Sequence, residues 1–423
     1  MFRSKNNCER YEEIPIQLDT PITLPVNGAR QSKTGHNFTM NDRSSYFDWY
    51  NAYFMVGFVV NKLADGGAFG AGDRIAMINN AASLINQLTV KQNGKMIYDC
   101  NNLHRFVNVK TIIEMSKDYI ETTGTDEFIY PDTSDTAEHR SDQAGYNIGF
   151  AIRKGLIQGG NLISVRIPLN RFSFFEALEQ NMLPPSQIQI GVQLTDDNEL
   201  IFKHGADDAR VVVKKLELWV PRMEFNSKGI ELVAKNYMKP TKWTYLREMI
   251  QESGSSQQIE QTFRITSGVK TPKHVFIYLQ RTDKSGSQTQ NPHLLDTFKL
   301  NAADTNCSLQ SARLEVGNGV FYPETEYSSN DMSRIFKDVL NYTYKTNDKN
   351  TGSLLNRSNF ESLFGLVYFN LEYQKEDVTN DPKQLTLRCR LNTLPTARYK
   401  IYALVMYDED VVIDSIGNEL III

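Results

Sequence analysis

The 423-residue chain repeats parts of its own sequence in the same order, roughly 200 residues apart. Residues 183–197 begin with Leu-Pro, continue as alternating apolar and polar residues, and end in an acidic cluster, and residues 394–408 follow the same plan. Earlier in each half, a Leu-x-Val run leads to an Asn-Gly dipeptide, at Asn93-Gly94 and at Asn318-Gly319. The spacing exceeds the ~20–50 residues of solenoid or propeller repeats. We therefore predict a duplicated domain. Its equivalent segments are Ile188–Leu194 with Tyr399–Val405, and Leu88–Val90 with Leu314–Val316.

The dominant hydrophobic period in the chain is two. Apolar residues alternate with polar ones through residues 188–194 and 385–391, and Val275, Ile277 and Leu279 have the same spacing. Such segments bury one face and expose the other, which is typical of antiparallel strands in a sandwich or barrel. An Asn-Gly dipeptide tolerates the positive φ angles of a tight hairpin turn, so each of the two ends a predicted strand in a hairpin.

Helical patterns are few. Residues 332–340 carry an apolar stripe at i, i+3, i+4, i+7 and i+8, with Ser329-Asn330-Asp331 as capping residues before it. A weaker stripe starts at Leu103, after Asn101-Asn102. Both predicted helices follow an Asn-Gly hairpin within about a dozen residues, so they form a third element of the repeat.

Long polar stretches separate these elements. Residues 122–145, 281–293 and 347–356 lack a period and are predicted to be surface loops, because strand patterns resume on both sides of them. The joint between the halves is expected between Pro221 and Gln257.

Composition argues against several classes of protein. The formal charge is −4, without a long basic run, whereas a chain that mainly grips nucleic acid is usually basic. No apolar run approaches the ~20 residues of a membrane span, and the first residues lack the apolar core of a signal peptide. The four cysteines have no metal or redox spacing and are predicted to be reduced thiols.

The search for catalytic, cofactor-binding or metal-binding residues yields none. The glycine-rich residues 65–73 lack the Gly-Lys-Ser/Thr ending of a phosphate loop and are interpreted as an inter-strand loop. The histidines do not pair at ligand spacing and are interpreted as surface or satisfied core residues: His36, His104, His139, His204, His274 and His293.

Two features keep alternative interpretations open. The acidic clusters at 196–199 and 408–410 are predicted to occupy equivalent repeat positions; they could act as acid/base pairs or bind Ca²⁺, but a solvated turn is favoured. The apolar end at 420–423 is either a last short strand or a tail that docks on a neighbouring subunit.

Taken together, these segments resemble the double jelly-roll major capsid proteins of eukaryotic DNA viruses, in particular those of adintoviruses and Polinton/Maverick elements. The resemblance covers roughly residues 84–414. It is carried by several weak matches in the right order, at residues 84–98, 216–223, 272–279, 359–371 and 399–413.

The resemblance implies an all-β fold of two tandem eight-stranded antiparallel jelly-roll sandwiches with a few short helices and long loops. It implies an N-terminal jelly roll at 1–222, a connection at 223–257 and a C-terminal jelly roll at 258–423. The implied function is that of a structural major capsid protein, a hexon-like homotrimer that builds pseudo-hexameric capsomers of an icosahedral shell. Its partners would be neighbouring capsomers and penton or minor capsid proteins, and its location the virion, after assembly inside the host cell. No enzyme activity, cofactor, sequence-specific nucleic acid or transmembrane segment is implied.

Two rival hypotheses remain at this stage. Paired jelly rolls with carboxylates in the groove between them also occur in glycan-acting hydrolases and carbohydrate-binding proteins. A host protein domesticated from a viral capsid gene would carry the same pattern. If the chain is a trimer, we expect the loop 122–145 at subunit boundaries, with Arg140, Arg153 and Arg171 as partners of its acidic residues in the neighbouring subunit.

Overall fold

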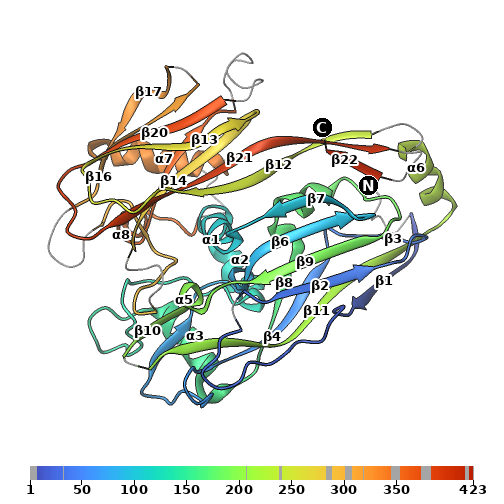
Figure 1. Cartoon of the computed structure of the whole chain (residues 1–423), viewed down its shortest axis with the longest axis horizontal. Coiled ribbons are helices and arrows are strands. Elements are labelled where there is room, and N and C mark those ends of the chain that lie inside the picture. Colours follow the sequence, from blue (N-terminus) through green and yellow to red (C-terminus); the bar gives the residue numbers. More distant parts are fainter. Residues whose placement is uncertain are drawn as a thin grey trace.

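The computed structural model describes the chain except residues 1–6, 32, 206, 238–240, 283–287, 301–306, 318, 344–352, 373–382, 415–418 and 423. It contains two β-sandwiches, one from each half of the chain, and Figure 1 shows the second lying across one side of the first.

The first sandwich has two four-stranded sheets. One has the strand order β1-β11-β4-β8 and the other β2-β9-β6-β7, and all neighbours are antiparallel. A short strand, β3 (Tyr46–Phe47), adds to β11. The eight main strands are β1 (Cys8–Ile16), β2 (Gly35–Met40), β4 (Tyr53–Lys62), β6 (Ile85–Gln92), β7 (Lys95–Cys100), β8 (Ile163–Pro168), β9 (Ile188–Leu194) and β11 (Ala209–Phe225).

The second sandwich repeats this arrangement. Its sheets have the orders β12-β21-β14-β19 and β13-β20-β16-β17, again antiparallel. A last short strand, β22 (Glu419–Ile422), pairs with β21. The main strands are β12 (Thr241–Glu252), β13 (Glu260–Val269), β14 (Pro272–Arg281), β16 (Leu309–Val316), β17 (Val320–Ser328), β19 (Val367–Asn370), β20 (Lys383–Leu391) and β21 (Tyr399–Asp414).

The two sandwiches therefore have one topology. In each, the first, eighth, third and sixth main strands form one sheet, and the second, seventh, fourth and fifth form the other. This is the strand order of a jelly roll, built from two Greek keys. The predicted fold class and the predicted duplication are confirmed at this level.

One of the two predicted equivalences is wrong. Leu88–Val90 and Leu314–Val316 both lie on the fourth strand of their sandwich, β6 and β16. Ile188–Leu194, however, is the seventh strand, β9, whereas Tyr399–Val405 belongs to the eighth strand, β21. The strand equivalent to β9 is β20. A Leu-Pro turn followed by alternation marks the start of a strand, and it carries no information about the place of that strand in the order.

The alternation of apolar and polar residues predicts burial well where one face of a strand is exposed to solvent. In β9 the residues Ile188, Ile190, Val192 and Leu194 are buried and their neighbours are half-exposed. The prediction is wrong for β14, which is buried on both faces. The side chains expected in water there, Phe276 and Tyr278, are covered, with Phe276 against Tyr342 of the helix α7.

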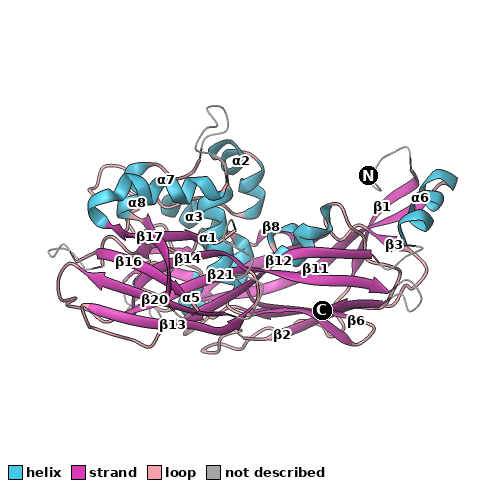
Figure 2. Cartoon of the chain, turned by 90° about the horizontal axis from the view of Figure 1, so that it is seen from above, coloured by secondary structure: helices cyan, strands magenta, loops and turns pink. Residues whose placement is uncertain are grey.

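The helices gather on one side of the strand layers, as Figure 2 shows from above. The two predicted helices are present, as α1 and α7, each after the fifth strand of its sandwich. The α-helices are α1 (Leu103–Glu114), α2 (Lys117–Glu121), α3 (Ile148–Ile157), α4 (Ser173–Glu176), α5 (Asp197–Leu200), α6 (Ser227–Tyr237), α7 (Met332–Tyr342) and α8 (Arg357–Ser362). Short 3-10 turns occur at Ala81–Leu84, Thr123–Glu127, Gln158–Gly160, Leu169–Arg171, Ala177–Glu179 and Ser329–Asp331.

Smaller elements complete the chain. Strands β5 (Arg74–Met77) and β10 (Ile201–His204) pair antiparallel, and β15 (Leu295–Asp296) pairs with β18 (Phe364–Gly365) in parallel. The first Asn-Gly hairpin has the positive φ angles expected, 49° at Asn93 and 83° at Gly94. Of the second, Asn318 lies outside the described residues and Gly319 has φ 90°.

The expected connection contains α6 and also β12, the first strand of the second sandwich. Strand β12 falls within the expected connection at 223–257 and pairs with β21 over its whole length. The division into 1–222, 223–257 and 258–423 stays a prediction.

Candidate functional site

The two sandwiches meet at a buried junction to which α1 contributes Arg105. Its guanidinium carbon lies 4.2 Å from the ring centre of Tyr402 on β21. The same group donates hydrogen bonds to Gln280 Oε1 on β14 at 2.8 Å and to Glu199 Oε2 at 3.0 Å. A guanidinium can stack on an aromatic ring and donate in its own plane at once, which a lysine cannot. Arg105 thus joins the first sandwich to the eighth and third strands of the second.

A second buried contact joins the edge strands β7 and β12. The Tyr98 hydroxyl donates to the Glu248 carboxylate, and both side chains are buried. Cys100 Sγ lies 3.7 Å from the Glu248 carbonyl oxygen, and Arg247 donates to the Asp99 carbonyl oxygen at 3.2 Å. Burial raises the pKa of Glu248, because a carboxylate loses hydration there. The contact uses side chains and single carbonyl groups; β7 and β12 share no strand ladder.

Aromatic packing and further hydrogen bonds extend the junction. The Phe174 ring lies 6.2 Å from that of Trp243 and 5.6 Å from that of Tyr245, both on β12. Asn108 Nδ2 donates to the His293 carbonyl oxygen at 2.9 Å. The largest cluster of buried apolar residues is continuous through both sandwiches. An interface of this kind resembles a domain interior, so we expect the sandwiches to move as one body.

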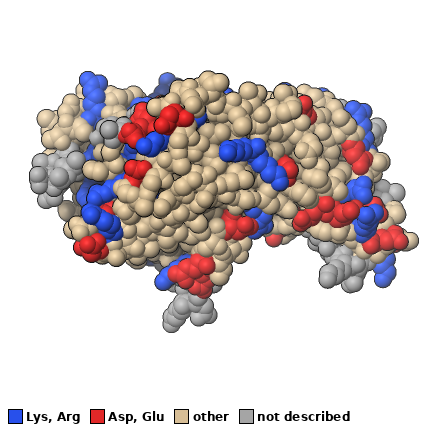
Figure 3. Space-filling model, turned by 90° about the horizontal axis from the view of Figure 1, so that it is seen from below, with Lys and Arg blue, Asp and Glu red and all other residues tan. Residues whose placement is uncertain are grey.

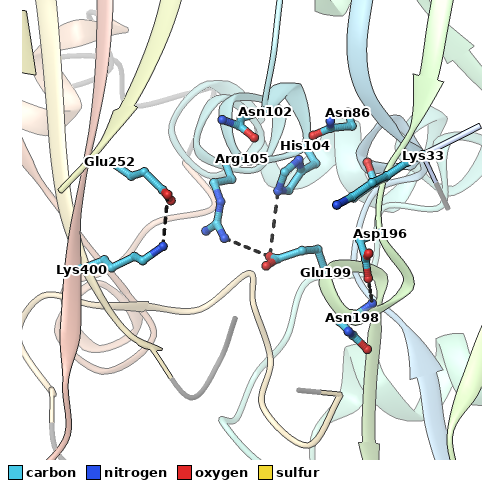
Figure 4. Close-up of a pocket in the computed structure, with 11 residues that line it drawn as sticks. Lys33, Asn86, Asn102, His104, Arg105, Asp196, Asn198, Glu199, Glu252 and Lys400 are labelled. Atoms are coloured by element: carbon cyan, nitrogen blue, oxygen red, sulfur yellow. Dashed lines mark hydrogen bonds and ion pairs between the residues drawn. The ribbon is translucent and has the colours of Figure 1, made fainter. Parts of the chain in front are cut away.

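A polar hollow with a volume of about 380 Å³ opens beside Arg105 (Figure 4). Its residues come from the start of α1, the turn around α5, and the ends of β12 and β21. They are Lys33, Asn86, Asn102, His104, Arg105, Thr195, Asp196, Asn198, Glu199, Glu252 and Lys400.

Four charged groups of this hollow form two ion pairs. Arg105 binds Glu199, and Lys400 Nζ lies 3.1 Å from Glu252 Oε1. The His104 ring is buried, and burial lowers its pKa well below the usual value, so the ring is neutral. Its Nε2 lies 3.9 Å from Glu199 Oε2, beyond hydrogen-bond distance. The two carboxylates are therefore held as ion-pair partners that connect elements of the fold, which is a structural task.

The two acidic clusters do not occupy equivalent positions, contrary to the prediction. Asp196 caps α5 by accepting from the Asn198 N–H at 3.0 Å, in the turn after the seventh strand. Residues 408–410 lie inside the eighth strand, β21, where each pairs with a cation. These pairs are Asp408 with Lys273, Glu409 with Arg247, and Asp410 with Lys242. The two acidic clusters thus lie on different elements of the fold, and the charges of residues 408–410 are neutralised by ion pairs.

The loop 122–145 also pairs differently from the prediction. Its acidic residues were expected to meet Arg140, Arg153 and Arg171 of another subunit, but these pairs form within the chain. Arg171 binds Glu127 at 2.8 Å, Arg153 binds Asp132 at 2.7 Å, and Arg140 lies 3.3 Å from Glu138. The reason is geometric, because the loop folds back over α3 and the 3-10 turn at Leu169–Arg171, which carry Arg153 and Arg171.

Asp132 also connects the two halves of the chain. Its Oδ1 accepts from Arg153 and from Asn147 at 2.8 Å, and its Oδ2 accepts from Asn291 of the second half at 2.8 Å. Arg153 is fully buried. Four polar groups therefore satisfy one another in the interior, which is the condition under which buried charges are tolerated.

Among the described residues, no group of three or more histidine, cysteine or acidic side chains could hold a metal ion. None of the four cysteines, all of which the structure describes, forms a disulfide bond. In the described part of the chain, none of the helices has both the length and the hydrophobicity needed to cross a bilayer. The glycine-rich residues 65–73 connect β4 to β5, as the interpretation as an inter-strand loop requires. Strand β22 spans Glu419–Ile422, so the apolar residues 420–422 match the first of the two interpretations, while residue 423 lies outside the described residues.

Comparison with known proteins gives a result at the level of structure. No protein-family model and no curated protein sequence matches the chain. A chain from the Sputnik virophage matches with a TM-score of 0.64 at 10% identity, over 99% of this chain and 89% of that one. The mavirus major capsid protein matches with a TM-score of 0.57 at 10% identity, covering 97% and 90%. The PBCV-1 virus capsid matches with a TM-score of 0.56 at 12% identity, covering 98% and 96%.

The chain has the double jelly-roll fold. The solved structures that share it are major capsid proteins of virophages and large DNA viruses. The matches cover nearly the whole of both chains, so the similarity in fold extends over both jelly rolls.

Sequence reasoning missed the residues that join the two jelly rolls. Arg105 interrupts the apolar stripe of α1, and Glu248 is an acidic residue inside a strand pattern. A charged residue on an otherwise apolar face was a usable signal, because such a residue is buried only with a partner. The partner itself, Tyr402 or Tyr98, could not be identified from spacing along the chain.

Proposed function

We propose that the chain is a structural major capsid protein of an icosahedral DNA virus, located in the virion shell. One observation carries the proposal: two sandwiches of identical topology are locked side by side by buried contacts, as Arg105 on Tyr402 and Tyr98 on Glu248 illustrate. The similarity in fold to capsid proteins of virophages and large DNA viruses supports it.

Three copies of such a chain would present six similar lobes. A homotrimer of this kind is pseudo-hexameric and can tile a shell with near-hexagonal units, which a single sandwich per chain could not do as a trimer. The contacts in a cyclic trimer are heterologous, so that one surface of each copy meets a different surface of the next. Neighbouring capsomers and penton or minor capsid proteins would be the further partners, with assembly inside the host cell.

One face of the molecule is of a kind that suits assembly rather than the binding of nucleic acid. Seen from the side where β4 and β11 lie in Figure 1, charged side chains stand in separate groups between broad uncharged areas (Figure 3). A continuous basic tract, the mark of backbone binding to DNA, is not visible on that face.

Electron microscopy of the purified protein tests the proposal. We expect discrete particles with a threefold or hexagonal outline, and ordered sheets or shells at high protein concentration. A field of single elongated molecules, unchanged on concentration, would contradict the capsid role and favour the hydrolase or carbohydrate-binding alternative.

A further inference from the structure

The outer face of the sheet β13-β20-β16-β17 carries a group of arginines. The apolar residues of β20 belong to the core, and Arg388 and Arg390, which alternate with them, therefore point to the opposite face. Residues that pair directly in an antiparallel ladder share a face. The ladder pairs Arg388 with Arg313 of β16, and Thr386 of β20 with Arg264 of β13. We call this group of four side chains the arginine face: Arg264, Arg313, Arg388 and Arg390.

Two of these arginines, Arg313 and Arg388, lie directly opposite each other in the ladder. Like charges at such positions repel each other and destabilise a sheet. The Phe321 ring of β17 offsets part of this repulsion, because a cation is attracted to the face of an aromatic ring. The ring centre lies 4.5 Å from the guanidinium carbon of Arg313 and 5.4 Å from that of Arg388. Both positive charges are thus held side by side at the surface, an arrangement that an anionic partner would stabilise.

The arginines outnumber the carboxylates on this face. On the outer side of β13, β20 and β16, the acidic residues that stand among the four arginines are Glu260 and Glu315, which leaves an excess of two positive charges. Arg388 donates to Glu315 Oε2 from Nε at 3.0 Å and from Nη2 at 2.7 Å. Arg390 Nε lies 3.8 Å from Glu260 Oε1. The Arg388 and Arg390 side chains are nevertheless 56% and 59% exposed.

The other two arginines of the face, Arg264 and Arg313, have no carboxylate partner in the described part of the chain. Arg313 donates from Nη2 to the Glu324 carbonyl oxygen at 2.8 Å. Arg264 is exposed, and its side chain makes no hydrogen bond with a described residue. A guanidinium has five N–H donors, so most of the donors of these two groups can bind a ligand.

The arginine face lies apart from the junction between the jelly rolls. In Figure 1, β16, β17 and β20 lie at the upper left, away from the first jelly roll. The strands of the second jelly roll that supply the junction contacts described above are β12, β14 and β21. These contacts within the chain therefore do not use the arginine face.

Charge complementarity requires an acidic partner, and the two glutamates of the face decide its class. Guanidinium groups bind carboxylates and phosphates through paired hydrogen bonds. A nucleic acid presents its phosphates in an unbroken row, which would bring some of them against Glu260 and Glu315. A protein segment can place carboxylates on the arginines and neutral or basic side chains on the glutamates. The mixed charge of the face therefore favours a polypeptide.

We propose that the arginine face is a docking surface for an acidic segment of a different protein, whose carboxylates accept hydrogen bonds from Arg264, Arg313 and Arg390. The proposal goes beyond the proposed function, because it requires neither a trimer nor a shell. The attraction is between solvent-exposed charges, so binding weakens as the salt concentration rises.

Fluorescence anisotropy with a labelled oligo-glutamate peptide of about ten residues, at low ionic strength, tests the proposal. The double variant Arg264→Gln/Arg313→Gln removes the two arginines that lack a carboxylate partner, and we expect its dissociation constant to be about tenfold higher than that of the wild type. The matched control is Arg10→Gln/Arg357→Gln, which removes the same charge from side chains that are 55% and 44% exposed outside the face. The control should bind the peptide like the wild type. Unchanged far-UV circular dichroism and melting temperature show that each variant is folded.

Four results would overturn the proposal. The wild type might fail to bind the peptide, or both double variants might lose affinity equally, which would show an effect of net charge alone. Tighter binding of an oligothymidylate that depends on Arg264 and Arg313 would assign the face to nucleic acid. Loss of self-association in Arg264→Gln/Arg313→Gln, measured by sedimentation velocity, would assign the face to contacts between copies.

A single substitution covers the case in which the double variant does not fold. Arg264→Gln removes a side chain that makes no hydrogen bond with a described residue, and we expect it to raise the dissociation constant about threefold. An unchanged constant would also overturn the proposal. Failure of peptide binding leaves the proposed function intact, because assembly is measured separately by sedimentation.

Discussion

Arg105 lies with its guanidinium carbon 4.2 Å from the ring centre of Tyr402, and the two residues belong to different jelly rolls. Arg105 also reaches Gln280 of the second jelly roll and Glu199 of the first. One side chain therefore contributes an ion pair, ring stacking and hydrogen bonds to the junction between the sandwiches. In the proposed shell the angle between the sandwiches would have to be constant, because an error in it would be repeated in every copy.

Removal of Arg105 should loosen the junction. Arg105→Ala removes the ion pair with Glu199 from a largely buried site, and breaking such a pair costs about 3–5 kcal/mol. Urea unfolding of the wild type and the variant measures this loss of unfolding free energy. The control is Arg388→Ala, because the Arg388 side chain in the pair with Glu315 is 56% exposed, and there we expect a loss of at most ~1 kcal/mol. Equal losses in both variants would show that Arg105 has no special role.

Asp132 should be equally sensitive. Asp132→Ala removes the partner of the fully buried Arg153 and the acceptor for Asn291, so we expect a loss of about 3–5 kcal/mol. Asp126→Ala is the matched change in the same loop, because its pair with Arg166 is exposed. It should change the melting temperature little. If Asp132→Ala had the same melting temperature as Asp126→Ala, the contacts of Asp132 would not stabilise the packing of the two halves of the chain.

Ile190 and Ile401 lie on non-equivalent strands, and each points into the core with 1% of its surface exposed. This placement can be tested by substitution. Replacing either with Asp would bury a carboxylate without a partner, at a cost of several kcal/mol against a total stability of roughly 5–15 kcal/mol. We expect both variants to be insoluble or to melt far below the wild type in thermal scans. Soluble variants with an unchanged melting temperature would show that these two side chains do not point into the core.

Asp197 should make stability depend on pH. Burial raises the pKa of this carboxyl from 3.8 to about 6. Between these values the folded state binds more protons than the unfolded state, so this contribution is full below pH 4 and is lost as pH rises through about 6. The loss corresponds to about 3 kcal/mol at 1.36 kcal/mol per pH unit.

Asp197→Asn keeps the oxygen that accepts from the Val211 N–H at 2.9 Å and removes the titration. The difference in unfolding free energy between wild type and variant should therefore change between pH 4 and 7, with the wild type relatively more stable at low pH. A constant difference over that range would show that Asp197 titrates normally.

The sequence predicted individual strands and helices well because their signals are local. Alternation identified β9 and β20, and the apolar stripes identified α1 and α7. The equivalence of 188–194 with 399–405 failed because period-two alternation is the same in every half-buried strand. The equivalence of the two Leu-x-Val runs was predicted correctly because each run is followed by a hairpin turn, and that turn requires particular residues.

The pairing of charges was the least predictable feature. Arg140, Arg153 and Arg171 were expected to cross a subunit boundary, yet each finds its carboxylate within the chain. Polar composition predicted a surface loop at 122–145, whereas Glu127, Asp132 and Glu138 are buried. Composition does not distinguish a solvated charge from a buried pair, because the partner comes from a distant part of the chain.

The assembly itself is the central claim, and sedimentation equilibrium of the wild-type protein at micromolar concentration tests it most directly. We expect a mass three times that of the 48.4 kDa chain, or larger closed assemblies built from that unit. A single 48.4 kDa species across the whole concentration range would contradict the capsid role.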